Sequence, residues 1–335
     1  MKNKRSIGLI LILCIILTGG LAWYLQSIPQ QAPTPTQDIT IDPGHTAAST
    51  LLLVARDQGY FAQHSLNVTF VESPSAAVAI SNLLNHTCDF GFVNEYTLSE
   101  PVLYNTTVRA VGTLAESDVN FVVGRRDRGV VRVQDLEGKR IGVTKGSIGE
   151  YYMDRFFVLN GLSPDNTTVI YLPPAALVTA LAGGDIDASF SPEPYVYQMQ
   201  KQMGENVVVW PVNLGQHARY SLICDGTTLQ ERPEIVEGVL ASVIQAETYV
   251  NSHQEDAKSV ARKQTNFDKQ YMDQDWKNHR LSVGLSQSLI TSMEDETRWR
   301  IHSNLTDAKE IPDFSNIIDP GTLKRLKPSS VTLIQ

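Results

Sequence analysis

The sequence predicts an α/β protein of two similar lobes, each built on a parallel sheet. The chain has 335 residues, whereas a single hydrophobic core stops growing at roughly 250 to 300 residues. Short apolar runs alternate with helical segments from residue 38 onwards. This layout is then repeated about a hundred residues later with the same glycine spacing.

The first copy begins with a strand at Ile39–Asp42 and a turn at Gly44. A helix through Leu51–Ala55 follows and ends at Gly59, and the next strand spans Asn67–Val71. This βαβ unit predicts parallel strands joined by a right-handed crossover. A helix at Ala76–Leu84 and a strand at Asp89–Val93 extend it.

The second copy repeats these elements in the same order. They are a strand at Arg140–Thr144, a turn at Gly146, a helix at Tyr151–Val158 that ends at Gly161, and a strand at Thr168–Tyr171. The turn glycine and the end glycine are 15 residues apart in both copies. Preferred βαβ lengths are an alternative explanation for this match.

The later sequence predicts a return to the first lobe, through a strand at Tyr220–Cys224 and a helix at Pro233–Asn251. We therefore expect lobe 1 at residues 38–120 and 216–335, and lobe 2 at residues 121–215. The connections near residues 115–130 and 211–221 would form a hinge. Because ligands bind beyond the carboxyl ends of parallel strands, facing lobes would share one ligand cleft.

The amino terminus carries an export signal. Lys2, Lys4 and Arg5 precede an uncharged apolar run from Ile7 to Leu25, which is close to the ~20 residues that span a bilayer. We expect a membrane anchor at residues 1–25, with a cleaved signal peptide as the alternative. Both would place the remaining chain outside the cell membrane. Residues 26–37, rich in Pro, Gln and Thr, are expected to form an extended linker.

Composition and motifs exclude several classes of protein. The net charge is −8 and no long basic run follows residue 5, which argues against a nucleic-acid partner. The sequence contains no nucleophile elbow, HExxH motif, P-loop or paired cysteine motif. We therefore expect a monomeric binder without catalysis, cofactor or metal. Cys88 and Cys224 permit one disulfide, with two buried free thiols as the alternative.

Four segments carry a resemblance to a known family: Leu51–Phe70, Gly138–Leu162, Gly184–Val196 and Arg298–Phe314. With these residues the chain resembles the solute-binding proteins of nitrate, sulfonate and taurine ABC transporters, a group that includes binders of thiamine-pyrimidine precursors. The resemblance implies a type II periplasmic-binding-protein fold, a small anionic or zwitterionic ligand between the lobes, and an ABC permease with its ATPase as partners. Related pyrimidine-precursor synthases are an enzymatic alternative, but their cysteine-rich metal segment has no counterpart here. A sensor that uses the same fold is a third possibility.

The strongest candidate ligand site is the turn between the strand at Arg140–Thr144 and the following helix. Unpaired N–H groups and the helix dipole favour an anion at such a turn, and glycines allow close backbone approach. An ordinary helix cap is the alternative interpretation. The predicted ligand-binding residues in this turn are Lys145, Gly146, Ser147, Ile148 and Gly149.

The remaining candidates lie at the corresponding turns of both copies and in the hinge. Those of the first copy are Gly44, His45, Thr46, Ser73, Asn94, Glu95 and Tyr96. Glu193 and Tyr195 follow the matching strand of the second copy. A carboxylate there could pair with a ligand amine and a tyrosine ring could stack on it, although a helix cap or a bridge between lobes would also explain each glutamate. Arg219 in the hinge could bind an anion or bridge backbone carbonyls.

Overall fold

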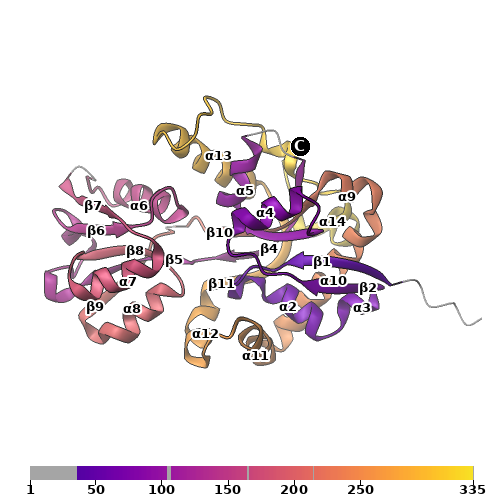
Figure 1. Cartoon of the computed structure of the whole chain (residues 1–335), viewed down its shortest axis with the longest axis horizontal. Helices are drawn as coiled ribbons and strands as arrows, with labels where there is room; N and C mark the ends of the chain where they lie inside the picture. The colour runs from indigo at the N-terminus through magenta and orange to yellow at the C-terminus, as the bar shows by residue number, and fades with distance from the viewer. Residues whose placement is uncertain (1–35, 104–106, 164–165, 214, 335) are drawn as a thin grey trace, which may run out of the picture. The chain divides into compact units, whose positions relative to one another are not determined.

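The computed structural model describes residues 36–103, 107–163, 166–213 and 215–334. The predicted anchor or signal peptide and nearly all of the predicted linker lie outside these residues. Within the described ranges, no helix combines the length and the apolar character needed to cross a membrane. The folded part forms one compact unit from Gln37 onwards and contains two β-sheets (Figure 1).

The first sheet has seven strands in the order β12-β11-β4-β10-β3-β1-β2. Strands β1, β2 and β3 are parallel, as the βαβ pattern predicts, whereas β10 runs antiparallel between β3 and β4. The sheet is therefore mixed, because the returning chain enters it in the opposite direction. The strands are β1 (Gln37–Asp42), β2 (Leu66–Phe70), β3 (Phe90–Asn94), β4 (Val108–Ser117), β10 (Ala218–Asp225), β11 (His279–Ser286) and β12 (Val331–Thr332).

The second sheet has five strands in the order β7-β6-β8-β5-β9. Strand β6 pairs parallel with β7 and β8, and β5 pairs antiparallel with β8 and β9. The stretch β2-β1-β3-β10-β4 of the first sheet has the same layout of parallel and antiparallel neighbours. The strands are β5 (Asn120–Arg125), β6 (Arg140–Val143), β7 (Thr168–Tyr171), β8 (Ala188–Pro192) and β9 (Val207–Pro211).

The glycines used to detect the repeat adopt matching conformations. Gly44, Gly59, Gly146 and Gly161 all have positive φ, between 62° and 70°. Residues with a Cβ rarely adopt this conformation, so glycine is favoured at each of these turns. The repeated spacing therefore reflects repeated backbone geometry at the start and end of equivalent helices.

Helices cover both faces of each sheet. In Figure 1, α4 and α5 lie on one face of the first sheet, and α2 and α10 on the other. The helices of this half are α2 (Thr50–Asp57), α3 (Tyr60–Gln63), α4 (Ala76–Leu84), α5 (Glu95–Val102), α9 (Gly226–Glu231), α10 (Pro233–Ser252), α11 (Gln254–Thr265), α12 (Lys269–Asp275), α13 (Gln287–His302) and α14 (Gly321–Leu326). Those of the other half are α6 (Ile148–Leu159), α7 (Pro174–Gly183) and α8 (Tyr195–Met203).

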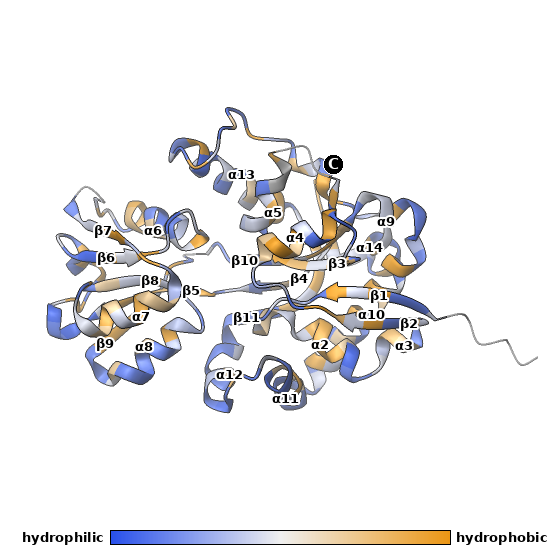
Figure 2. Cartoon of the chain, in the orientation of Figure 1, coloured by the Kyte–Doolittle hydropathy of each residue, from blue (hydrophilic) through white to orange (hydrophobic). Residues whose placement is uncertain are grey.

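Burial explains the hydrophobic pattern. In α2, the five residues Leu51–Ala55 are all buried, because α10 and α11 pack against this helix. Figure 2 shows the contrast between the hydrophobic residues of α2 and the hydrophilic surface of α12. In the second sheet, Val122 packs with residues of α6 while its neighbour Val123 packs with α7 and α8, as alternating strand side chains require.

Two short crossovers connect the sheets, from β4 to β5 and from β9 to β10. Asp118 of the first crossover shares a 2.5 Å hydrogen bond with His217 of the second, and also accepts one from Asn213. These side chains hold the two crossovers together. Cys88 and Cys224 are buried free thiols in the first sheet, so the structure has the second of the two predicted alternatives.

Candidate functional site

A hollow of about 230 Å³ is bounded by residues from both sheets. It joins a hollow of about 290 Å³ through the shared residues His45, Thr46, Asn94 and Tyr220. The second hollow extends to the loop before α4, which contains Ser73. The residues that line the first are His45, Thr46, Asn94, Val119, Asn120, Ile148, Pro192, Glu193, Pro194, Tyr220, Phe267, Tyr271, Asp275 and His279.

Asp42, at the end of β1, holds two walls of this space in place. Its carboxylate accepts hydrogen bonds from the backbone N–H of Gly44 at 2.9 Å and of Ser73 at 3.1 Å. Asp42 is buried, whereas His45 in the first turn is exposed. The loops that carry the predicted residues His45 and Ser73 are thus fixed by a side chain that the sequence did not single out.

Asn120 is the most informative polar residue of the hollow. It is the first residue of β5 and only 3% exposed. Neither its side-chain oxygen nor its side-chain nitrogen has a hydrogen-bond partner among the described residues. Leaving a buried amide unpaired costs about 1–3 kcal/mol. A ligand in the hollow would remove this cost by pairing with the carboxamide.

The N-terminus of α6 lies beside Asn120. A Cβ at Gly149 would stand 3.4 Å from Asn120 Oδ1, so glycine permits the close approach. The N–H groups of Ile148 and Gly149 have no hydrogen-bond partner in the described part of the chain. They are the first two residues of a helix, where unpaired donors and the helix dipole favour an anion. Asn120 and Ile148 line the hollow and Gly149 is the next residue of the helix, so the carboxamide and these N–H groups make this end of the hollow favourable for an anion.

In the first half of the predicted anion turn, the Gly146 N–H is already hydrogen-bonded within the protein. Glu150 Oε2 accepts the Gly146 N–H at 2.5 Å, and Glu150 Oε1 accepts the Tyr171 hydroxyl at 2.7 Å. Ser147 caps α6 by accepting the Glu150 N–H at 3.3 Å. Lys145 and Gly146 are exposed and do not line either hollow. Of this predicted turn, only Ile148 is among the residues that line the hollow.

The carboxylates of Glu193 and Asp275 line another part of the hollow. Glu193 Oε2 accepts the Tyr197 N–H at 3.1 Å, at the start of α8. Burial, together with the negative charge of Asp275, raises the pKa of Glu193 to about 8. Asp275 itself accepts hydrogen bonds from His279 at 2.8 Å and from the Tyr271 hydroxyl at 3.0 Å. Although burial opposes ionisation of Asp275, its interaction with His279 holds its pKa below the ordinary value.

Aromatic rings complete the wall of the hollow. Tyr220 stacks on Phe92 with ring centroids 5.5 Å apart, and Phe267 meets Tyr271 edge-on at 4.7 Å. The ring centroids of His45 and Phe267 are 5.2 Å apart. Apart from His45, these rings were not among the predicted ligand residues, because their roles depend on segments that meet only in the fold.

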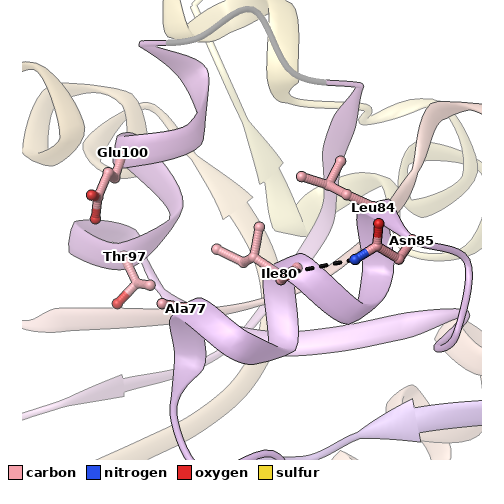
Figure 3. A pocket seen from close by; sticks show the side chains of 7 residues that line it. Ala77, Ile80, Leu84, Asn85, Thr97 and Glu100 are labelled. Carbon is pink, nitrogen blue, oxygen red and sulfur yellow. Dashed lines mark hydrogen bonds between the residues drawn. The ribbon is translucent and has the colours of Figure 1, made fainter.

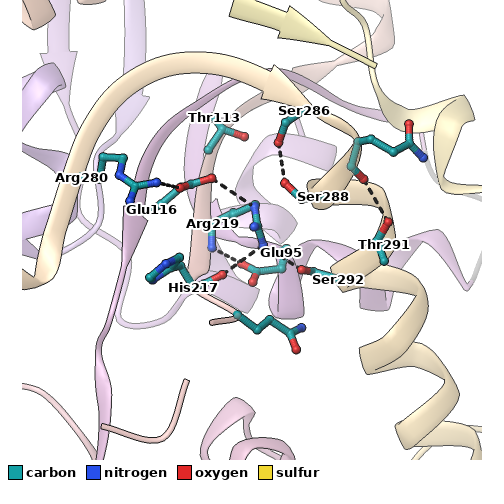
Figure 4. A network of polar contacts seen from close by, with 12 residues as sticks. Glu95, Thr113, Glu116, His217, Arg219, Arg280, Ser286, Ser288, Thr291 and Ser292 are labelled. Carbon is teal, nitrogen blue, oxygen red and sulfur yellow. Dashed lines mark hydrogen bonds and ion pairs between the residues drawn. The ribbon is translucent and has the colours of Figure 1, made fainter. Parts of the chain in front are cut away.

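Glu95 and Arg219 lie outside the hollow, in a buried network between β10, β4 and α13 (Figure 4). Glu95 Oε2 accepts the backbone N–H of Arg219 at 2.6 Å, and the Arg219 guanidinium donates to Ser292 at 2.8 Å. Arg219 Nε also lies 3.4 Å from Glu116. Both predicted ligand residues therefore have internal partners, although Glu95 Oε1 and Arg219 Nε have no hydrogen-bond partner among the described residues.

Burial raises the pKa of Glu95 to about 7, although the Arg219 N–H opposes the shift. Glu296 in α13 is also fully buried, and burial and the nearby Glu95 raise its pKa well above the ordinary value. Glu95 and Glu296 are therefore two buried carboxyls whose pKa values are both raised.

Tyr96 and Tyr195 are also placed away from the hollow. The Tyr96 hydroxyl donates to the carbonyl of Gly146 at 2.9 Å, and Arg300 lies 3.7 Å above its ring. Tyr195, the first residue of α8, is half-buried and packs against the core formed with α7. By contrast, Gly44, His45, Thr46, Ser73, Asn94, Ile148 and Glu193 all line one of the two joined hollows.

A larger hollow, of about 370 Å³, lies on the surface of α4 and α5 (Figure 3). Its residues include Ile80, Leu84 and Glu100. It lacks buried polar groups without partners, so it offers less basis for specific recognition of a small polar molecule. In the described part of the chain, no cluster of three or more metal-ligating side chains could hold a metal ion.

Comparisons with known proteins agree with this architecture. A Bacillus subtilis protein that is named as an aliphatic sulfonates-binding protein is 21% identical over 280 residues, which cover 82% of this chain and 84% of the relative. The solved periplasmic aliphatic sulphonate binding protein SsuA from Escherichia coli has a TM-score of 0.73 and 16% identity, covering 85% of this chain and 98% of SsuA.

An enzyme shares the fold as well. The desulfurization enzyme DSZB has a TM-score of 0.66 and 16% identity, covering 86% of this chain and 98% of the enzyme.

The α/β periplasmic-binding-protein fold predicted from the sequence is confirmed. A profile of one family, described as NMT1/THI5 like, matches residues 46–257, more than half of the sequence. The chain therefore belongs to the NMT1/THI5-like family.

Proposed function

We propose that this protein is the extracytoplasmic solute-binding component of an ABC importer, and that it captures a small anionic or zwitterionic solute of the sulfonate class. In this proposal, lobe 1 comprises residues 38–120 and 216–335 and lobe 2 comprises residues 121–215. The ligand lies between them, and an ABC permease with its ATPase receives it. The monomeric protein would be exported through the predicted segment at residues 1–25.

The observation that carries the proposal is the unpaired Asn120 carboxamide beside the free N–H groups of Ile148 and Gly149. A sulfonate has three acceptor oxygens, enough to receive hydrogen bonds from all of these donors. Hydrogen bonds to a charged acceptor contribute about 1.5–3 kcal/mol each. The names of the two sulfonate-binding proteins described above support the same ligand class.

We propose binding without catalysis. The described residues that line the hollow beside Asn120 include no serine, cysteine or lysine, and its acidic groups have structural partners in Tyr197, Tyr271 and His279. The similarity to DSZB concerns the fold, on which binding and catalysis can both occur. Turnover of a sulfonate or sulfinate by the purified protein would contradict this part of the proposal.

An aminopyrimidine is a second candidate ligand, because the hollow presents aromatic rings beside carboxylates. Tyr220, Phe267 and Tyr271 supply stacking surfaces, and Glu193 could accept a hydrogen bond from an exocyclic amine. This ligand would not need the anion-favouring end at Asn120.

A thermal-shift screen distinguishes the candidates. A ligand at 100 times its dissociation constant stabilises the folded protein by about 2.7 kcal/mol. We expect alkanesulfonates or aminoalkanesulfonates to raise the Tm, and nitrate, bicarbonate and aminopyrimidines to raise it less. A response to aminopyrimidines alone would favour the second candidate, and no response to any compound would contradict the proposed class.

A further inference from the structure

Glu193 occupies an unusual position for a carboxylate in a site that favours anions. It lies in the turn between β8 and α8 and lines the same hollow as Asn120. The residues that line this hollow include no lysine or arginine. The partial positive charge of the α6 N-terminus, about half an elementary charge, therefore cannot offset both an ionised Glu193 and an anionic ligand.

Hydrogen bonding leaves one oxygen of Glu193 free. Oε2 accepts the Tyr197 N–H, whereas Oε1 has no hydrogen-bond partner in the described ranges. No salt bridge to Glu193 is present among the described residues either. A half-buried carboxyl with a free oxygen can donate a hydrogen bond to a ligand when neutral, or accept a hydrogen bond from a ligand amine when ionised.

The groups around Glu193 come from several elements. Asp275 and Tyr271 lie on α12, His279 on β11, Tyr220 on β10, and His45 in the turn after β1. Asp275 adds a negative charge, which opposes ionisation of Glu193, as does burial. Burial raises the pKa of both Tyr220 and Tyr271 far above neutrality, so these tyrosines remain neutral near pH 8.

We propose that Glu193 selects ligands by charge: with its carboxyl protonated the hollow accepts a simple anion, and with its carboxyl ionised it accepts a zwitterion whose amine pairs with Glu193. The inference rests on the proposed function and specifies the ligand class of the same hollow. It predicts that the two ligand types respond to pH in opposite directions. Binding of the zwitterion also moves the Glu193 proton to solvent, whereas binding of the simple anion retains it.

The size of the effect follows from the pKa of about 8 for Glu193. The apparent affinity scales with the fraction of protein in the competent protonation state. Between pH 7 and pH 9, the ionised fraction rises about tenfold and the protonated fraction falls about tenfold. A zwitterion should therefore bind about tenfold more tightly at pH 9, and a simple anion about tenfold more weakly.

The test is titration calorimetry on the purified protein with matched probes, taurine and ethanesulfonate, which differ by one amine. Glu193→Gln is the control variant, because glutamine keeps an acceptor for the Tyr197 N–H and does not titrate. Dividing the wild-type affinity by the variant affinity removes the titration of the taurine amine and of the nearby histidines. Titrations at pH 7 in two buffers of different ionisation enthalpy then count the protons released.

We expect the wild-type to variant ratio to rise about tenfold with pH for taurine and to fall about tenfold for ethanesulfonate. We also expect release of close to one proton per taurine bound at pH 7, and none from the variant. Parallel pH responses of the two probes, or equal proton release by wild type and variant, would overturn the role of Glu193 while leaving sulfonate binding intact. If neither probe binds at any pH, the charge selection and the proposed sulfonate function both fail.

Discussion

Replacing Asn120 by leucine should stabilise the empty protein and weaken ligand binding. The carboxamide is buried without a partner, so its removal recovers a desolvation cost of about 1–3 kcal/mol. Unfolding of a chain of this length carries an entropy of about 0.6 kcal/mol per K, at roughly 2 cal/mol/K per residue. The Tm of the empty variant should therefore rise by about 2–5 °C.

Ligand should stabilise the wild type more than the variant. A bound sulfonate at 100 times its dissociation constant adds about 2.7 kcal/mol to the wild type, which corresponds to about 4 °C. The Asn120→Leu variant loses a hydrogen bond to a charged acceptor and should bind roughly 10- to 100-fold more weakly. Scanning calorimetry of both proteins, with and without ligand, measures both effects.

Asn213→Leu is the matched control. Asn213 is also buried, but its side chain hydrogen-bonds to Asp118 and His217 between the crossovers. The same substitution there should lower the unfolding free energy by about 1–3 kcal/mol, because Asp118 loses a donor. If the empty Asn120→Leu protein is less stable than the wild type and binds sulfonate normally, the carboxamide is neither a cost to stability nor a ligand contact.

Two further predictions concern stability. Because burial raises the pKa of Glu95 to about 7, the folded protein binds more protons than the unfolded chain between about pH 4.5 and pH 7. The free energy of unfolding should therefore fall over this range by an amount on the order of 2 kcal/mol, and the Tm should fall with it. Glu95→Gln should flatten this fall, whereas a Tm that rises with pH in both proteins would contradict the prediction. A Cβ at Gly142 would lie 2.5 Å from Ile186 Cδ1 and 2.7 Å from Leu177 Cδ2, so Gly142→Ala should cost about 1–3 kcal/mol in denaturant unfolding. Its control, Gly183→Ala in α7, meets no atom closer than 3.8 Å and should be neutral or stabilising by about 0.5–1 kcal/mol; equal effects of the two substitutions would count against the packing argument.

Local sequence patterns were sufficient to predict most of the secondary structure. The predicted helix at Ala76–Leu84 and strand at Thr168–Tyr171 have the observed bounds. The helix predicted at Tyr151–Val158 begins three residues earlier, at Ile148, because Ser147 provides the cap. Helix periodicity, glycine turns and caps are local properties, so they can be inferred from neighbouring residues alone.

The candidate site was harder to predict because it depends on distant partners. Glu95 and Glu193 follow matching strands, but only Glu193 lines the hollow, since the Arg219 N–H of β10 holds Glu95 in the buried network. Asn120 carries no motif, and its significance lies in the absence of a partner, which a sequence does not reveal. Asp275 became relevant only when α12 was placed against the turn that carries Glu193.

Glu150 illustrates the same limit in the predicted anion turn. Glycine, serine and lysine before a helix predicted an open anion site, yet the carboxylate of Glu150 accepts the Gly146 N–H. A glutamate three residues after a serine cap is a common capping arrangement. The sequence therefore contained a signal that Glu150 would cap this turn. The backbone N–H groups that have no partner among the described residues are those of Ile148 and Gly149.

A structure of the protein with a bound alkanesulfonate or aminoalkanesulfonate would show directly whether Asn120 and the N-terminus of α6 hold the ligand. We expect the sulfonate oxygens to lie at hydrogen-bond distance, about 2.7–3.2 Å, from the Asn120 side chain and from the N–H groups of Ile148 and Gly149. An aminoalkanesulfonate should also direct its amine toward Glu193. A sulfonate bound at Arg219 or in the hollow beside Ile80 and Leu84, with Asn120 still unpaired, would show that the proposed site is wrong.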